Sequence, residues 1–206
     1  HGSLLPKYRG AAPTNWAIIN GDKTSGVTVI KMNDKMDEGD IVLKKEIAID
    51  AEDTNITLSE KLSDLAASSL MEAIELIESN KVKLTEQDDS TATYAPKLKK
   101  KDGLINWDEP ALTIHHKVHG LLPWPGAYTF FKDKILKILK TEVAQELKEK
   151  AKNGEVVAIL KHKGIVVKTG SGNLLIQYVQ IEGKKPFDTD AFLCGHKIEA
   201  GYIFGN

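Results

Sequence analysis

The stretch His1-Gly-Ser-Leu-Leu-Pro-Lys-Tyr-Arg-Gly10, taken with Met36-Asp-Glu-Gly-Asp40, decides how the front of this chain is interpreted. The first stretch places a lone histidine ahead of a serine, two leucines and a proline, and the second gathers acidic residues around Gly39. An imidazole and a carboxylate from a nearby turn are the minimum set for moving protons and stabilising an oxyanion. Acidic glycine turns are also common as solvated loops, so the pairing alone is weak evidence for a catalytic site.

The segments beside these two stretches predict alternating helices and strands. Residues 13–20 predict a short helix, because proline is well tolerated in a first helical turn. Residues 26–32 and 39–49 alternate β-branched and polar side chains and predict two strands. The acidic turn connects them, which places Asp37 where a strand meets a loop, a usual position for catalytic groups in open α/β sheets.

A long amphipathic helix and a linker are expected next. Thr57-x-x-Glu60 is a capping-box pattern, and apolar residues recur at helical spacing from Leu58 to Ile77, which predicts a helix that buries one stripe on a sheet. Residues 83–102 lose this periodicity and contain Pro96, which predicts a linker. The expected domains are therefore 1–82 and 103–206.

Charge divides the chain in the same way. Residues 1–90 carry 10 basic and 17 acidic side chains, whereas residues 91–206 carry 18 basic and 12 acidic ones. An acidic front and a basic back predict two domains, the second of which faces a polyanion, although a solvated lysine-rich surface is the alternative. The same two interpretations, solvated surface or phosphate contact, apply equally to the cluster Lys97, Lys99, Lys100 and Lys101.

The back part of the chain is rich in predicted strands. Four segments, 134–140, 155–161, 164–168 and 174–181, read as short strands separated by glycine turns. This spacing predicts a small antiparallel barrel, which a short helix over 188–193 follows.

The sequence predicts no membrane-spanning segment, no metal site and no internal disulfide. No apolar run approaches the length of a membrane span and no signal peptide opens the chain. His115 and His119 share a helix face in 111–120, but no cysteine or further histidine lies at ligand spacing, so no metal site is expected. The single cysteine, Cys194, fits a reducing cytoplasm, and a small buried apolar role is expected for it.

The signature stretch resembles one enzyme family. His1-Gly-Ser-Leu-Leu-Pro followed by Arg9-Gly10 is similar to the signature of the folate-dependent formyltransferases. The resemblance implies that His1 and Asp37 are catalytic and flank the formyl group of 10-formyltetrahydrofolate. A family asparagine, with the folate-binding first half of the N-terminal domain, would precede residue 1. The substrate-binding loop is then Ser3, Leu4, Leu5 and Pro6.

The junction and the back part resemble one branch of this family. Thr93-Tyr-Ala-Pro-Lys97, Ile105-Asn-Trp107 and Pro123-Trp-Pro-Gly-Ala-Tyr-Thr129 are similar to the methionyl-tRNA formyltransferases. The resemblance implies the C-terminal part of a doubly wound, Rossmann-like formyltransferase domain, followed by an OB-like β-barrel that binds tRNA. The tRNA contacts implied in this way are Arg9, Lys97, Lys99, Lys100 and Lys101.

This resemblance implies transfer of a formyl group to the α-amine of methionine on initiator methionyl-tRNA, without a metal, a membrane or an obligate protein partner. His1 as an imidazolium would donate a hydrogen bond to the oxyanion, while Asp37 would keep it charged and help move the amine proton. Two alternatives stay open: a folate-dependent formyltransferase for a ribonucleotide or amino-sugar amine, and an RNA-binding module without activity. The chain by itself is expected to be inactive.

Overall fold

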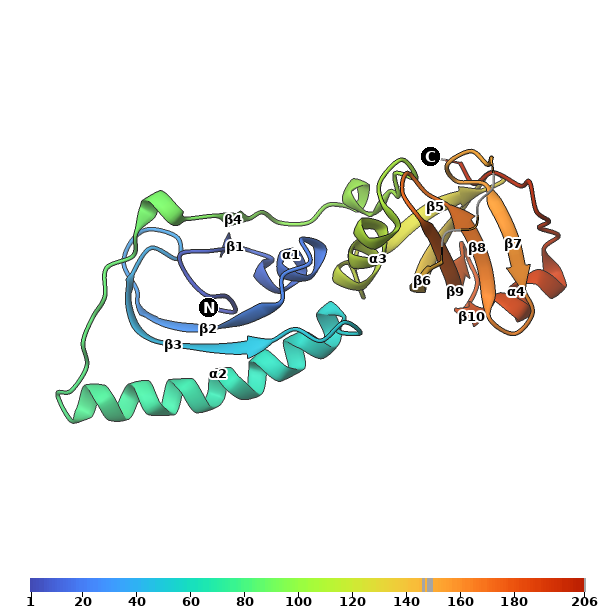
Figure 1. Cartoon of the computed structure of the whole chain (residues 1–206). Helices are drawn as coiled ribbons and strands as arrows, with labels where there is room; N and C mark the ends of the chain where they lie inside the picture. The colour runs from blue at the N-terminus through green and yellow to red at the C-terminus, as the bar shows by residue number, and fades with distance from the viewer. Residues whose placement is uncertain (146, 148–149, 206) are drawn as a thin grey trace. The chain divides into compact units, whose positions relative to one another are not determined.

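The chain forms two compact units, His1–Leu98 and Lys99–Asn206, in a computed structural model that describes residues 1–145, 147 and 150–205 (Figure 1). The boundary falls within the segment expected to be a linker, 83–102. Residues 85–95 are hydrogen-bonded into unit 1, since Thr85 pairs with Ile41. The part of the expected linker that precedes Leu98 is therefore structured, because its main chain finds partners on strands of unit 1.

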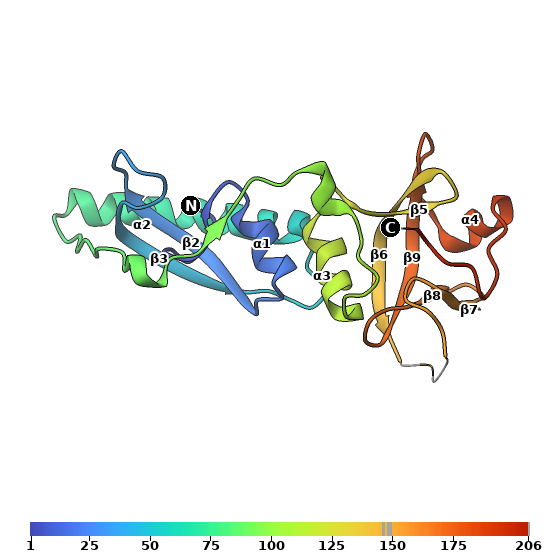
Figure 2. The ribbon, with the colours of Figure 1, turned by 90° about the horizontal axis from the view of Figure 1, so that it is seen from above.

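Unit 1 is a β-hairpin packed against one long helix, with a short helix beside it (Figures 1 and 2). The hairpin pairs β2 with β3 antiparallel, from Thr24 opposite Ala48 to Lys31 opposite Asp40. A separate two-residue parallel pairing joins β1 to β4. The elements are β1 (Arg9–Gly10), α1 (Pro13–Ile19), β2 (Thr24–Lys31), β3 (Asp40–Ala48), α2 (Asn55–Glu78) and β4 (Tyr94–Ala95).

The helix α2 begins three residues before the position that the sequence pattern indicated. Thr54 is its N-cap, and the side chain of Thr54 accepts from the N–H of Thr57 while Thr57 Oγ1 accepts from the N–H of Thr54. The predicted box of Thr57 with Glu60 is wrong, because the Thr57 hydroxyl already serves as the partner at the third helical position.

The apolar stripe of α2 is covered only in part. Leu58 and Leu62 pack with Ile18 and Val27 in the core of unit 1. Further along the helix, apolar side chains that the pattern assigned to the buried stripe face solvent: Ile74 is 39% and Ile77 is 52% exposed. Ala73, in the same half of the helix, is 1% exposed, so the stripe is covered at some positions there and open at others.

In the residues that the structure describes, unit 2 contains a six-stranded antiparallel sheet and two α-helices. Five strands follow the order β5-β6-β9-β8-β7, and β10 pairs with β9. The elements are α3 (Ala111–Gly120), β5 (Ala127–Phe131), β6 (Lys134–Ala144), β7 (Val156–Leu160), β8 (Gly164–Lys168), β9 (Asn173–Ile181), β10 (Phe187–Asp188) and α4 (Thr189–Gly195).

The C-terminal segment links the two edges of this sheet. The carbonyl of Tyr202 accepts from the N–H of Val156 on β7 at 2.7 Å. Gly205 and Phe130, on β5, exchange main-chain hydrogen bonds at 3.1 and 3.2 Å. The edge strands β5 and β7 are thus both paired, which leaves fewer main-chain groups open at the sheet edges.

Unit 2 differs from the sequence-based expectation in two places. The four expected strands are present, but β5 was not predicted, because the proline-rich residues 122–126 made Ala127 and Tyr128 read as part of a turn. Cys194 is exposed rather than buried, since α4 turns Thr189 and Phe192 inward instead. None of the helices in the described residues combines the length and apolarity that a membrane span requires.

Candidate active site

His1 and Asp37, which the sequence proposed as a pair, face each other in unit 1. Nδ1 of His1 lies 3.5 Å from Oδ1 of Asp37, and the two side chains are 10% and 23% exposed. This separation is within ion-pair range but longer than a good hydrogen bond, so the pair is close without being locked together. Main-chain hydrogen bonds to Thr28 on β2 fix the backbone of His1.

The carbonyl of Tyr8 orients the ring of His1. Nε2 lies 2.9 Å from this carbonyl oxygen, and because a carbonyl only accepts, Nε2 carries a proton. Nδ1 is therefore the ring nitrogen turned toward Asp37. Tyr8 itself adopts a left-handed backbone with φ of 61°.

The phenol of Tyr8 is held by two neighbours. Its hydroxyl donates to Asp22 Oδ2 at 2.7 Å and accepts from the side-chain amide of Asn20 at 3.0 Å. Burial is the main reason that the pKa of Tyr8 rises to about 12, and the Asp22 carboxylate adds to the rise. The phenol thus stays protonated and donates to Asp22.

Asp37 is held in a tight turn between β2 and β3. Its backbone is left-handed, with φ of 58°, and its Oδ2 accepts from the main-chain N–H of Gly10 at 2.8 Å. The turn needs glycine at residue 39, because a Cβ there would lie 2.0 Å from the carbonyl oxygen of Lys31. Gly10 has φ of 120°, and a Cβ on it would lie 2.7 Å from the carbonyl oxygen of Ala95.

The expected substrate-binding loop is only partly accessible. Ser3 is buried and its Oγ donates to the carbonyl of Lys7 at 2.6 Å, while Leu5 is fully buried with its N–H on Thr28 Oγ1. Pro6 accepts a main-chain hydrogen bond from Thr93. Leu4 is the member of the loop that reaches a cavity.

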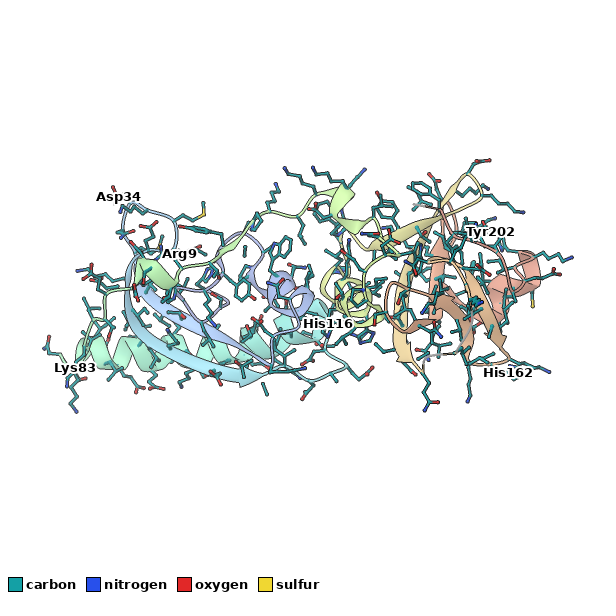
Figure 3. The ribbon with its side chains drawn as sticks, turned by 45° about the horizontal axis from the view of Figure 1, so that its top comes forward. Arg9, Asp34, Lys83, His116, His162 and Tyr202 are labelled. Atoms are coloured by element: carbon teal, nitrogen blue, oxygen red, sulfur yellow. The ribbon has the colours of Figure 1, made fainter. Side chains whose placement is uncertain are left out.

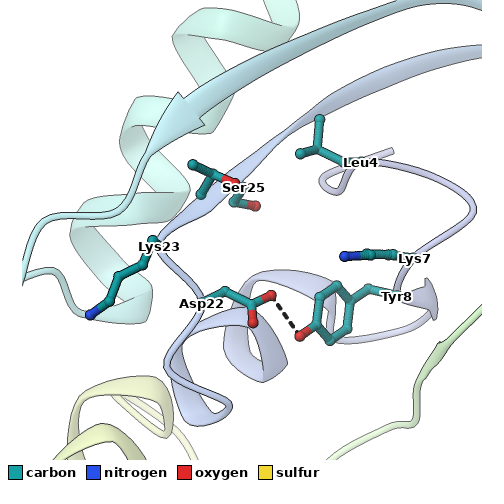
Figure 4. Close-up of a pocket in the computed structure, with 7 residues that line it drawn as sticks. Leu4, Lys7, Tyr8, Asp22, Lys23 and Ser25 are labelled. Atoms are coloured by element: carbon teal, nitrogen blue, oxygen red, sulfur yellow. Dashed lines mark hydrogen bonds between the residues drawn. The ribbon is translucent and has the colours of Figure 1, made fainter.

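This cavity has a volume of about 250 Å³ and a largely polar lining (Figure 4). The hydrogen bond from the Tyr8 hydroxyl to Asp22 forms part of its wall. It is lined by Leu4, Lys7, Tyr8, Asp22, Lys23, Thr24 and Ser25.

Arg9, a predicted tRNA contact, lies in the interior of unit 1 (Figure 3). It is the only arginine among the 206 residues and is 2% exposed. Its Nη2 is 2.7 Å from Asp89 Oδ1, and its Nη1 is 3.6 Å from Glu38 Oε1. Burial alone would lower the pKa of Arg9, but these two carboxylates raise it above the ordinary value. In this structure Arg9 is therefore buried and paired with carboxylates of unit 1.

Gln87, which the sequence reasoning placed in the linker, is a part of this site. It is 8% exposed, and its amide joins Arg9 to the backbone of the Asp37 turn. No pattern in the sequence distinguished it from the polar residues that follow, because its partners lie 48 to 78 residues away.

The four lysines of the predicted phosphate cluster are all exposed. Lys97 belongs to unit 1, and Lys99, Lys100 and Lys101 belong to unit 2. Among the described residues no group of three or more His, Cys, Asp or Glu side chains is arranged to hold a metal ion. The rings of His115 and His119 lie 4.1 Å apart and both are buried, and His115 Nδ1 is 3.0 Å from Thr141 Oγ1.

An imidazole and a carboxylate that face each other on adjoining loops can in principle move protons between reacting groups. Residues 1–74 match the family model described as formyl transferase, and residues 97–197 match the model of the formyl transferase C-terminal domain. The chain belongs to the formyltransferase family.

Curated relatives match over nearly all of this chain. A methionyl-tRNA formyltransferase of Geobacter sulfurreducens is 42% identical over 205 residues, which is 100% of this chain and 63% of the relative. One from Caldanaerobacter subterraneus is 44% identical over 204 residues, which is 98% of this chain and 65% of the relative. The chain thus spans somewhat less than two thirds of the length of these relatives.

Among solved structures, the fold is similar to HypX from Aquifex aeolicus in complex with tetrahydrofolic acid. The TM-score is 0.71 with 21% sequence identity, over 98% of this chain and 38% of that one. At this identity the likeness concerns the fold alone.

Proposed function

We propose that the complete protein transfers the formyl group of 10-formyltetrahydrofolate to the α-amine of methionine on initiator methionyl-tRNA, in the cytoplasm. The observation that carries this proposal is the facing pair of His1 and Asp37, 3.5 Å apart, in a member of the formyltransferase family. The methionyl-tRNA formyltransferases that match nearly the whole chain favour this acceptor over others.

The geometry of the pair suits the chemistry of this reaction. The folate supplies the formyl group, and the amine nitrogen forms a bond to the formyl carbon as the bond from that carbon to the folate nitrogen breaks. His1 Nδ1 points away from Tyr8 and would donate to the oxygen that becomes negative in the tetrahedral intermediate. Asp37 would keep His1 charged and take part in moving the amine proton toward the folate nitrogen.

Each residue in this scheme needs to lower the activation free energy of the reaction by only a few kcal/mol, on the order of what single hydrogen-bond donors supply. One donor to an oxyanion is typically worth about 3 kcal/mol of barrier, and positioning of the two reactants supplies more. The 3.5 Å separation leaves the carboxylate and the imidazole able to engage a reacting group that approaches their shared edge. We propose that the polar cavity beside Leu4 belongs to the substrate-binding surface.

We propose that unit 2 is the OB-like domain that holds tRNA and that unit 1 is the C-terminal part of a Rossmann-like catalytic domain. Residues 99–206 contain 17 lysines against 12 acidic side chains, an excess that favours a polyanionic partner. The exposed cluster of Lys99, Lys100 and Lys101 lies where phosphates could reach it.

The test is a formylation assay of the complete protein with 10-formyltetrahydrofolate and two acceptors, methionyl-tRNA and an amino-sugar nucleotide. We expect formylmethionyl-tRNA to form only when both the folate and methionyl-tRNA are present. Formylation of the amino-sugar nucleotide alone would overturn the proposed acceptor, and the absence of any transfer would overturn the proposed reaction.

A further inference from the structure

The side chain of Gln87 connects two parts of unit 1 that are far apart in the sequence. Its Oε1 accepts from Arg9 at both Nε, 3.2 Å, and Nη2, 2.9 Å. Its Nε2 donates to the main-chain carbonyls of Asp37 and Gly39, each at 2.8 Å. Two donated and two accepted hydrogen bonds satisfy the full capacity of a glutamine amide.

This arrangement needs an amide at position 87. A carboxylate would pair with Arg9 but would place an acceptor against the carbonyl oxygens of Asp37 and Gly39. An ammonium or guanidinium could donate to those carbonyls but would be repelled by Arg9. A glutamine accepts at one end and donates at the other, so it alone matches both sides.

The turn that Gln87 contacts contains a residue in an uncommon backbone conformation. Asp37 has φ of 58°, a conformation that costs a non-glycine residue energy and is retained when its surroundings fix it. The N–H of Gly10 fixes the carboxylate of Asp37, and Gln87 fixes the carbonyls on either side of the turn. Arg9 precedes Gly10 in β1, so this strand holds Asp37 directly through Gly10 and Gln87 through Arg9.

The segment that carries Gln87 is itself anchored at both ends. Thr85 exchanges main-chain hydrogen bonds with Ile41 on β3 at 2.8 and 3.0 Å. Beyond Gln87, the carbonyl of Thr93 accepts from the N–H of Arg9 at 2.9 Å, and β4 pairs with β1. The amide of Gln87 is therefore presented to the Asp37 turn from a fixed backbone.

We propose that Gln87 is a positioning residue for the reaction, which sets the distance and direction of the Asp37 carboxylate relative to His1 through the chain Arg9–Gln87–Asp37. This inference rests on the proposed function of the His1–Asp37 pair. Gln87 touches no reacting atom, so its effect falls on turnover through Asp37 and leaves binding of methionyl-tRNA unchanged.

The experiment uses the complete protein with Gln87→Glu, both alone and combined with Asp37→Asn. Gln87→Glu keeps the pairing with Arg9 and removes the donors to the turn, so the protein should stay folded while kcat falls about 10- to 100-fold. KM for methionyl-tRNA should stay unchanged, and the thermal unfolding midpoint should stay above the assay temperature although two carbonyls lose their donor. In the Asp37→Asn background, Gln87→Glu should cause no further loss, because the residue through which it acts has been disabled.

Two variants control this cycle. Glu86→Gln changes one charge at the exposed neighbouring position and should leave kcat unchanged. Gln87→Met removes both the donor and the acceptor of the amide. If Gln87→Glu does not fold, the same comparison with and without Asp37→Asn is made with Gln87→Met. Failure of both Gln87 variants to fold would mean that the residue serves the fold, and would overturn the proposal.

The remaining outcomes separate this inference from the proposed function. Normal turnover of Asp37→Asn would contradict the proposed function itself. Loss of turnover in Asp37→Asn beside an unchanged Gln87→Glu would overturn the role of Gln87 alone. An equal loss from Gln87→Glu in both backgrounds, or a loss confined to KM, would also overturn it.

Discussion

The main-chain N–H of Gly10 donates to Oδ2 of Asp37 at 2.8 Å, across 27 residues of sequence. This contact uses one oxygen of the carboxylate for the fold and leaves Oδ1 to face His1 Nδ1. The fold thus holds the carboxylate in one orientation, with one oxygen bonded to the main chain and the other turned toward the imidazole.

Asp37→Asn in the complete protein should therefore lower kcat by at least about 100-fold, because it removes the charge that faces His1 and keeps an oxygen for Gly10. Methionyl-tRNA affinity should stay near normal, since the loss falls on the transition state. Steady-state formylation kinetics and equilibrium tRNA binding measure the two quantities. Asp40→Asn is the control and should do far less; equal losses at both positions would remove the special role of Asp37.

Replacing Lys99, Lys100 and Lys101 by alanine should weaken tRNA binding. Each lost phosphate contact lowers the slope of log K against log salt by about 0.7 to 0.9, so the triple variant should lose up to about two to three units of slope. Filter binding of tRNA at several salt concentrations gives the slope.

A second triple variant separates this cluster from the general charge of unit 2. Lys132, Lys184 and Lys185 are also exposed, and their replacement by alanine removes the same charge. A smaller effect is expected from them. Equal effects of the two triple variants would assign the salt dependence to net charge rather than to the cluster.

Arg9→Met should destabilise unit 1 instead of weakening RNA binding. The substitution leaves the Oε1 of Gln87 without its donors, and an unsatisfied buried acceptor costs about 1 to 3 kcal/mol. Denaturant unfolding measures this loss. Lys35→Ala removes an exposed partner of Glu38 and should change the free energy of unfolding by less than about 0.5 kcal/mol. A loss of tRNA affinity at unchanged stability would return Arg9 to the RNA-binding surface.

Features of this protein that depend on neighbouring residues were predicted from the sequence, whereas those that depend on distant residues were not. Short-range sequence patterns predict the hairpin, α1, α2 and the central strands of unit 2. The signature stretches indicate His1 and Asp37 as the candidate catalytic pair. The burial of Arg9 was not predicted from the sequence. Its partners Gln87 and Asp89 lie about 80 residues away along the chain. Short-range sequence patterns do not predict contacts between residues so far apart.

The N-terminal end of α2 should contribute stability that is lost in acid. Burial raises the pKa of Asp53, but hydrogen bonds from Lys61, the N–H of Asp50 and Thr57 lower it more, so the net shift is downward. A carboxyl with a lowered folded-state pKa stabilises the fold fully above the unfolded value, about 3.9, and ceases to do so as pH falls through the folded value.

Asp53→Asn should therefore be less stable than the unmodified chain at pH 7, and the difference should shrink below about pH 4. Denaturant unfolding of the two proteins at a series of pH values measures it. Asp64→Asn, at an exposed position of the same helix, is the control. A difference that stays constant down to pH 2 would contradict the assignment of this stability to the Asp53 carboxylate.

Unit 2 should fold and bind RNA by itself. Its core is internal: Trp107 stacks on Phe204 with ring centroids 6.0 Å apart, and the segment around Gly205 joins the two edges of the sheet. Unit 1 by contrast leaves Leu70, Met71, Ile74 and Ile77 of α2 exposed, and apolar surface of that kind favours association with another segment.

We therefore expect residues 99–206 to unfold in one cooperative transition and to bind tRNA with strong salt dependence, while the 206-residue chain transfers no formyl group. Thermal unfolding, tRNA binding and formylation assays test the three statements, with the complete protein as the positive control. The matched control for binding is residues 99–206 with Lys99, Lys100 and Lys101 replaced by alanine, which should fold equally well and bind less tightly. Turnover by the 206-residue chain near that of the complete protein would contradict the expectation, because it would mean that unit 1 assembles a working site with its apolar helix face exposed.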